Sequence, residues 1–130
     1  MVQTDRATQD TLKARETFSL ISADKVDGTA VYNTRAEKLG SIHSVMIDKI
    51  SGRVGYAVMS FGGFLGIGER YHPLPWSMLR YDEEQDGYIV DIDRQVLEGA
   101  PAYAEDELRW DDPAFGPALD DYYGAPPFMH

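Results

Sequence analysis

The sequence contains no cysteine. This absence excludes disulfide bonds, thiolate chemistry and cysteine metal sites together. Long apolar runs are also missing, because none approaches the ~18 residues that a membrane-spanning helix needs. Residues 1–17 are polar and hold no apolar stretch of the kind found in secretory signals. We therefore expect a cytoplasmic protein that does not insert into a membrane.

Basic residues are few. The chain has 12 lysines and arginines against 22 acids, which gives a net charge of −10 and a pI of about 4.5. A field of this sign repels the phosphate backbone of nucleic acids. It also disfavours docking onto an anionic membrane surface. Nucleic acid is therefore not expected among the partners.

The length of 130 residues suits a single folded domain, but the composition shifts along the chain. Residues 1–17 form a polar segment that we expect to be a flexible N-terminal arm. Residues 18–100 contain the apolar and β-branched runs, and we predict that they form the folded domain. Residues 101–130 form an acidic tail with seven acids, one base, five of the seven prolines and six of the fifteen aromatic residues.

The clearest strand pair lies at Leu39–Ile50 and Arg53–Phe61, two apolar runs on either side of Ser51-Gly52. Glycine adopts the positive φ of a tight hairpin turn without steric cost, so Ser51-Gly52 predicts the turn. Along the second run both alternating sets of residues are apolar, so both faces should be covered. The two sets are Val54, Tyr56 and Val58, and Gly55, Ala57, Met59 and Phe61. One face can fill a barrel, whereas the other needs a helix, the tail or a second subunit.

Shorter runs predict the remaining strands. Thr29–Tyr32 and Tyr88–Ile92 are rich in β-branched and aromatic residues. Tyr71–Pro75 is extended, and its prolines place it at a sheet edge or a barrel corner, since proline cannot donate to a ladder.

Helical signals are few. Trp76–Leu79 predicts one helical turn, and Asp93 and Gly99 bracket a short helix at Arg94–Glu98. The predicted fold is mainly β: a small closed or partly open antiparallel β-barrel with one short helix and an extended C-terminal tail.

Several short motifs follow one another in a fixed order. They are GTAVYN (28–33), EKLGSI (37–42), VMID (45–48), SGRVGYAV (51–58), GGFLGIG (62–68) and LPW (74–76). This ordered set resembles the PRC-barrel domain family, which is named after the cytoplasmic domain of the photosynthetic reaction-centre H subunit and includes the C-terminal domain of the ribosome maturation factor RimM. The resemblance covers roughly residues 18–100. It implies a small β-barrel used for binding and assembly.

The glycine-rich segment Gly62–Gly68 could be mistaken for a nucleotide site. A phosphate-binding loop needs a lysine after its last glycine, and Glu69 stands there instead. A dinucleotide-binding turn needs a helix to follow, and the next residues lead to a proline. We expect these glycines to shape the backbone and to bind no ligand. Phe64, Leu65 and Ile67 then either cap the core or form an exposed apolar patch.

The three histidines, His43, His72 and His130, are candidate metal ligands. A zinc or iron site needs three or four convergent ligands. The spacing does not bring these three together, since one lies in a predicted strand, one in a proline-rich corner and one at the last position. We expect no metal, and a buried or half-buried His43 that bonds to the backbone.

Catalytic patterns are missing too. Acid–base catalysis needs two carboxylates in different environments within a cleft, and most acids of this chain lie in predicted turns, where water solvates them. Ser60 and Ser77 lack the Gly-x-Ser-x-Gly context of a nucleophile elbow. We predict no catalytic residue, no cofactor and no enzymatic activity.

Aromatic residues set the tail apart, because a disordered acidic tail is usually poor in them. The tail could wrap its own barrel, cross onto a second subunit or remain loose. We predict an interaction surface that combines apolar residues of the tail with apolar residues of the loop and turn before it. Its members are Phe64, Leu65, Ile67, Trp76, Trp110, Phe115, Tyr122, Tyr123 and Phe128.

Three functional hypotheses follow. The first is a non-enzymatic module for protein binding and assembly, which forms a homo-oligomer, with a dimer favoured, or binds another protein or a membrane-bound complex. The second, suggested by the resemblance, is an accessory protein of a photosynthetic reaction centre or electron-transfer complex. The third is a small-molecule-binding barrel with its site at Gly62–Gly68 or at the barrel mouth.

Overall fold

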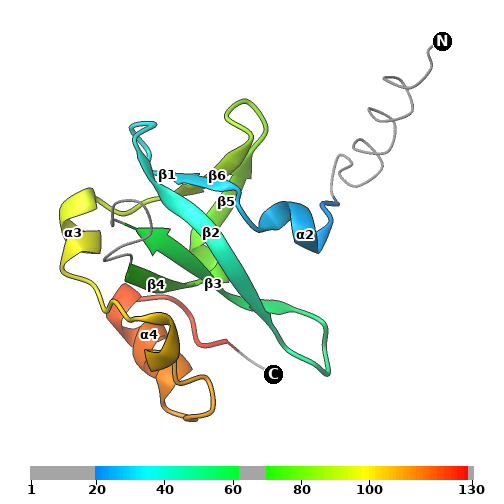
Figure 1. The fold of residues 1–130 in the computed structure, drawn as a ribbon, viewed down its shortest axis with the longest axis vertical. Helices are drawn as coiled ribbons and strands as arrows, with labels where there is room; N and C mark the ends of the chain where they lie inside the picture. The colour runs from blue at the N-terminus through cyan, green and yellow to red at the C-terminus, as the bar shows by residue number, and fades with distance from the viewer. Residues whose placement is uncertain (1–19, 62–69, 129–130) are drawn as a thin grey trace.

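The computed structural model describes residues 20–61 and 70–128. Its framework is one six-stranded sheet with the strand order β4-β3-β2-β1-β6-β5, which curves into half of a barrel (Figure 1). The strands are β1 (Ala30–Tyr32), β2 (Lys38–Ile47), β3 (Val54–Phe61), β4 (Arg70–Pro75), β5 (Leu79–Asp82) and β6 (Gly87–Val90). The predicted mainly β, partly open barrel is confirmed. The predictions on the arm 1–17 and on Gly62–Gly68 lie outside the described residues.

The two edge strands of the sheet, β4 and β5, are neighbours in the sequence. The 3-10 helix η1 (Trp76–Met78) joins them, so chain continuity brings the two edges together at one corner. Pro73 and Pro75 lie in β4, as predicted for an edge. The outer side of β4 is capped where Tyr71 exchanges two backbone hydrogen bonds with Tyr103 of the tail, at 2.9 and 3.0 Å. The tail thereby shields part of an edge that could otherwise pair with another chain.

One pair of strands is parallel. β1 pairs with β6 in parallel, with Val31 opposite Tyr88 and Tyr32 opposite Ile89, whereas the other four pairs are antiparallel. The sheet is therefore mixed, and this pair departs from the antiparallel prediction. Parallel neighbours need a long connection, which the four intervening strands supply here.

Three short helices accompany the sheet in the described residues. They are α2 (Ala23–Val26), α3 (Arg94–Glu98) and α4 (Phe115–Tyr123), and a second 3-10 helix, η2 (Glu105–Glu107), precedes α4. The structure confirms the predicted helix at α3 and the predicted helical turn at η1. None of the described helices has the length and apolar character needed to cross a membrane.

Helix α4 lies in the tail, where the sequence predicts extended chain. Gly116 and Pro117 suggest a break, yet both lie in the first turn of the helix. An N–H in that turn has no helical partner, so proline loses nothing there. Gly124 ends the helix in the left-handed conformation, at φ +66. The glycine and proline content of the tail therefore marks the two ends of a helix.

Strand β3 is buried on both faces, as its two apolar sets predict. Ala57 and Met59 have no exposed surface and belong to the inner core, whereas Tyr56 and Val58 of the other face are 8% and 0% exposed. The hairpin turn before the strand is also confirmed, with Gly52 at φ +78. The inner core consists of Val26, Val31, Leu39, Ile42, Ala57, Met59, Leu74, Tyr88, Val90, Ile92 and Leu97. It covers one face of β3 and leaves the other to the tail.

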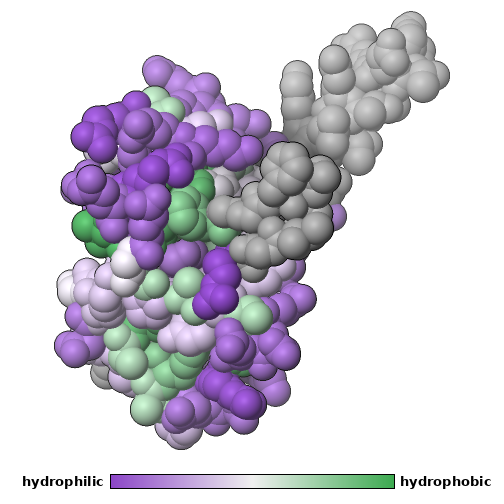
Figure 2. Space-filling model, turned by 60° about the vertical axis from the view of Figure 1, so that its left-hand side comes forward, coloured by the Kyte–Doolittle hydropathy of each residue, from purple (hydrophilic) through white to green (hydrophobic). Residues whose placement is uncertain are grey.

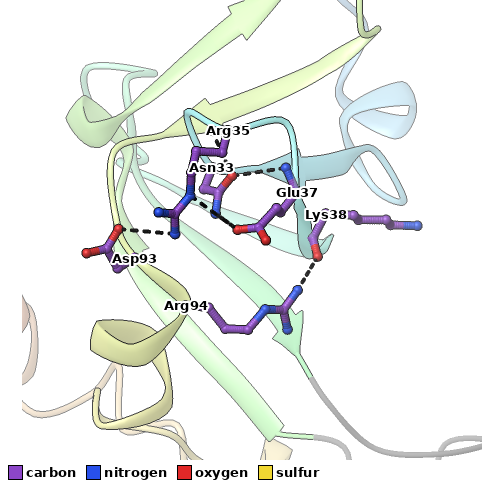
Figure 3. Close-up of polar contacts among 6 residues, drawn as sticks. All are labelled: Asn33, Arg35, Glu37, Lys38, Asp93 and Arg94. Carbon is purple, nitrogen blue, oxygen red and sulfur yellow. Dashed lines mark hydrogen bonds and ion pairs between the residues drawn. The ribbon is translucent and has the colours of Figure 1, made fainter.

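A polar network fixes the start of α3 against the connection between β1 and β2 (Figure 3). Oδ1 of the buried Asn33 accepts hydrogen bonds from the backbone N–H groups of Arg35 and Glu37. Nδ2 of Asn33 donates to Glu37 at 2.6 Å, and this bond lowers the pKa of the Glu37 carboxyl. Arg35 also pairs with Asp93 at 3.7 Å, and Arg94 donates to a backbone carbonyl of β2 at 2.8 Å. The network sets where the chain leaves the barrel and the tail begins.

Glycine is required at position 40, where β2 passes β3. A Cβ at Gly40 would lie 2.0 Å from the backbone carbonyl oxygen of Ser60. We predict that Gly40→Ala lowers the free energy of unfolding by about 3 kcal/mol, because the strands must move apart to admit the methyl group. Urea denaturation followed by tryptophan fluorescence measures this loss.

Gly52→Ala is the matched control. A Cβ at Gly52 meets no atom within 4 Å, so only its positive φ adds strain, of about 1 kcal/mol. Equal losses in the two variants would contradict the close approach of β2 and β3 at Gly40.

Candidate binding groove between the hairpin and the tail

The tail covers the outer face of β3 with a cluster of aromatic rings. The ring centroid of Tyr56 lies 5.3 Å from that of Trp110 and 6.1 Å from that of Phe128. Phe115 packs edge-on against Trp110 at 4.9 Å. In Figure 1 the tail, coloured orange to red, passes below the sheet and ends near the hairpin between β2 and β3. The tail therefore packs on its own barrel, which is one of the three alternatives left open by the sequence.

A glycine brings α4 close to the barrel. A Cβ at Gly116 would lie 2.7 Å from the hydroxyl oxygen of Tyr56, so a larger residue would push the helix away from β3. Figure 2 shows the resulting surface from the side that carries α3 and α4: green and white areas gather over the middle and lower part, whereas the upper part is mostly purple. The part of the molecule that carries the tail thus exposes a mixture of apolar and polar groups.

A buried hydrogen bond ties the tail to β3. The hydroxyl of Tyr56 donates to Oδ2 of Asp120 at 3.1 Å, and the backbone N–H of Phe128 donates to the same oxygen at 3.3 Å. Asp120 is only 5% exposed, and its Oδ1 is buried without a hydrogen-bond partner among the described residues. Burial, and then the charge of Asp120, raise the pKa of Tyr56 to about 12, so the phenol keeps its proton at neutral pH. The result is a buried carboxylate whose hydrogen bonds come from neutral donors.

A groove of about 700 Å³ lies between the β2–β3 hairpin and the tail. The hairpin contributes Met46, Ile47 and Ile50, and the tail contributes Trp110 and three prolines. Ile50 is 95% exposed and Ile47 is 49% exposed. Burying side chains of this size is worth roughly 1.5–3 kcal/mol each, so an apolar wall left in water is suited to binding a partner.

The charged groups of the groove are mainly acidic. Asp48, Asp112 and Asp120 line it, and Lys49 is the basic residue among the lining groups. Asp112 accepts a hydrogen bond from the backbone N–H of Ala114 at 2.9 Å, so its contact is with a neutral donor. An apolar wall and an acidic rim therefore lie within one groove.

The structure brings together part of the predicted interaction surface. Trp110 and Phe128 line the groove, and Phe115 packs edge-on against Trp110 without lining the groove itself. Trp76 packs edge-on against Tyr88 at 5.3 Å and shares with Phe128 an adjoining hollow of about 440 Å³. Trp76, which directly follows β4, and Phe128 of the tail therefore line the same hollow.

Other members of the predicted surface lie elsewhere. Tyr122 and Tyr123 pack against each other at 4.9 Å and line a separate hollow with Val96. Tyr123 is directed to the inner core, and burial raises the pKa of its hydroxyl. Three further members are not described by the structure: Phe64, Leu65 and Ile67.

Sequence reasoning missed the hairpin side of the groove. Ile47 and Ile50 appear in the sequence as part of an apolar run that ends in Ser51-Gly52. Ile50 directly precedes the turn Ser51-Gly52, where the hairpin offers little to bury a large side chain, and this position was the available signal. Asp120 gave no signal, because its burial depends on where α4 packs.

The histidines make contacts of other kinds. Nε2 of His43 hydrogen-bonds to the carboxylate of Glu105 at 2.8 Å, and the ring lies 4.5 Å from that of Tyr71. The prediction of a buried or half-buried His43 bonded to the backbone is therefore wrong: the side chain is exposed, and it hydrogen-bonds to a carboxylate of the tail. His72 is 2% exposed, and burial lowers the pKa of its ring, which is neutral at pH 7. Within residues 20–61 and 70–128, no three histidine, aspartate or glutamate side chains are grouped to hold a metal ion.

We predict that Tyr56→Phe lowers the free energy of unfolding by about 2 kcal/mol, because it removes a donor from a buried carboxylate. The raised pKa also gives the loss a pH dependence. The folded chain holds the Tyr56 proton more tightly than the unfolded chain, so this stabilisation is complete below pH ~10 and is lost as the pH rises towards about 12. The difference in the free energy of unfolding between the native chain and the Tyr56→Phe variant should therefore become smaller between pH ~10 and about 12.

Denaturation curves at neutral and alkaline pH measure both effects. Tyr122→Phe is the control, since Tyr122 is 46% exposed and its change at pH 7 should stay within about 0.5 kcal/mol. A Tyr56→Phe variant as stable as the control at pH 7 would show that the bond to Asp120 does not hold the tail.

A protein-family match covers the barrel and only one wall of the groove. Residues 19–97 match the family model of the PRC-barrel domain, which is more than half of the chain. No curated protein matches the sequence. The match includes all six described strands and therefore the hairpin wall of the groove, and it ends before the tail that forms the other wall. The resemblance noted in the sequence is thus confirmed, and the chain belongs to the PRC-barrel domain family.

Proposed function

We propose that this chain is a non-enzymatic module that binds another protein through the groove between the β2–β3 hairpin and the tail. Membership in the PRC-barrel family supports a module of this kind. The observation that carries the proposal is the exposure of Ile50, at 95%, beside Ile47 and Trp110 in one groove. Large apolar side chains gathered in a hollow with a polar rim are typical of interaction sites.

The two walls of the groove are held in different ways. The hairpin wall belongs to the ladder between β2 and β3, with Met46 opposite Tyr56 and Ile47 opposite Val54. The tail wall is held at separate points, by the bond of Asp120 to Tyr56 and by the packing of Arg53 over the ring of Phe128 at 4.9 Å. Binding energy is gained most readily where aromatic anchors are already in place, and Trp110 meets this condition because Tyr56 and Phe115 hold it.

The homodimer stays a prediction. Its motivation was the two apolar faces of Val54–Phe61 together with the aromatic tail, and the tail of the same chain covers the second face around Tyr56. An accessory role in a photosynthetic or electron-transfer complex is a narrower form of the proposal, in which the partner is membrane-bound. The small-molecule hypothesis also stays a prediction.

Affinity purification from the native cell, with membranes included, tests the proposal. The double variant Ile47→Ser/Ile50→Ser removes the apolar wall and adds no charge. We predict that at least one protein recovered by the native chain falls about tenfold or more with the double variant, as expected when roughly 1.4 kcal/mol of binding energy is lost.

Val96→Ser is the matched control, because Val96 is also exposed, at 48%, but lines a different hollow. It should recover the same proteins as the native chain. An identical set of proteins with all three chains would refute the groove as the binding site.

A further inference from the structure

We propose that the groove selects a basic, apolar segment of its partner, in which lysine or arginine side chains alternate with aliphatic ones. This inference rests on the proposed function and names the chemistry of the partner. The apolar side chains would lie against Ile47, Ile50 and Trp110, and the cationic groups would meet the acidic rim.

The first support is the buried carboxylate of Asp120, which lines the groove. Its Oδ2 accepts hydrogen bonds from Tyr56 and Phe128, both neutral, and its Oδ1 has no partner among the described residues. Asp120 is 5% exposed and its Oδ1 is buried, so its carboxyl group loses hydration, and a cation nearby would offset that loss. The tail has therefore placed an acidic group at the groove whose hydrogen bonds come from neutral donors alone.

The second support is the sign of the surroundings. With Asp48 and Asp112, three acidic residues line the groove, and Lys49 is the one basic residue in its described lining. The neighbouring cation, Arg53, lies over the ring of Phe128 and lines the adjoining hollow, which Asp120 also borders, but it makes no ion pair with Asp120 among the described contacts. The tail as a whole carries seven acids and one base. A basic segment would thus be attracted to the groove before contact and held at its rim afterwards.

The same charges disfavour a second copy of this chain as the occupant. The chain has a net charge of −10, so a copy would bring like charge to an acidic rim. A purely apolar segment would leave Asp120 buried without a cation. A segment that carries both kinds of side chain can pack its apolar groups against the hairpin wall and place its cations beside the acids.

A phage-displayed library of random twelve-residue peptides, selected on the full chain, tests the inference. Peptides enriched by selection are synthesised with a fluorescent label, and fluorescence anisotropy gives their affinities for the native chain and its variants. We expect the enriched peptides to be net positive, with lysine or arginine next to leucine, isoleucine or phenylalanine. Their affinity should fall as salt rises from about 0.05 M to about 1 M, because exposed charges are screened.

The rim is tested by Asp112→Asn, in which the amide oxygen can still accept the hydrogen bond from Ala114. Loss of this charge should weaken the enriched peptides about threefold to fivefold, the range of an exposed ion pair. Asp106→Asn is the matched control: it removes one charge from η2, away from the groove lining, and should change the affinity less than about twofold.

The possible outcomes separate the two proposals. No enriched peptide, or peptides that bind the Ile47→Ser/Ile50→Ser variant as tightly as the native chain, would refute the groove itself. Enriched peptides that need the isoleucines but are neutral or acidic, or that bind Asp112→Asn as tightly as the native chain, would refute the basic partner and leave the groove standing.

Discussion

Strand β3 carries apolar side chains on both faces, and two separate layers must cover it. The curved sheet supplies the first layer, with Ala57 and Met59 in its interior. The tail supplies the second by placing aromatic rings and the carboxylate of Asp120 around Tyr56. Burial of apolar surface stabilises a domain of this size only if most of that surface is removed from water. The path of the tail is therefore part of the fold.

The groove is a consequence of this second layer. The hairpin extends past the region that the tail covers, so Ile47 and Ile50 stay exposed while Tyr56, further along β3, is buried. The tail also brings two of the three acids of the groove, Asp112 and Asp120. The edge bridge between Tyr71 and Tyr103 and the bond between His43 and Glu105 hold the start of the tail to the same sheet. The family barrel thus supplies the hairpin wall of the candidate groove, and the tail supplies the other wall.

The barrel could be predicted from the sequence because its signals are local. The turn at Gly52, the two apolar sets of β3 and the helix bracketed by Asp93 and Gly99 each depend on neighbouring residues. The parallel pairing of β1 with β6 and the burial of Asp120 depend on contacts between distant segments. Composition alone cannot reveal such contacts. It drew attention to the aromatic tail as a candidate surface, but not to the hairpin residues that face the tail across the groove.

The central claim, that each tail covers β3 of its own chain, is tested most directly by nuclear magnetic resonance on a mixture of isotope-labelled and unlabelled protein. A fully labelled sample should show nuclear Overhauser effects between the rings of Tyr56 and Trp110, whose centroids are 5.3 Å apart. An isotope-filtered experiment on the mixture, which detects only contacts between different chains, should show none for this pair. Strong filtered signals between Tyr56 and Trp110 would mean that the tail crosses to a second chain, and would contradict the account.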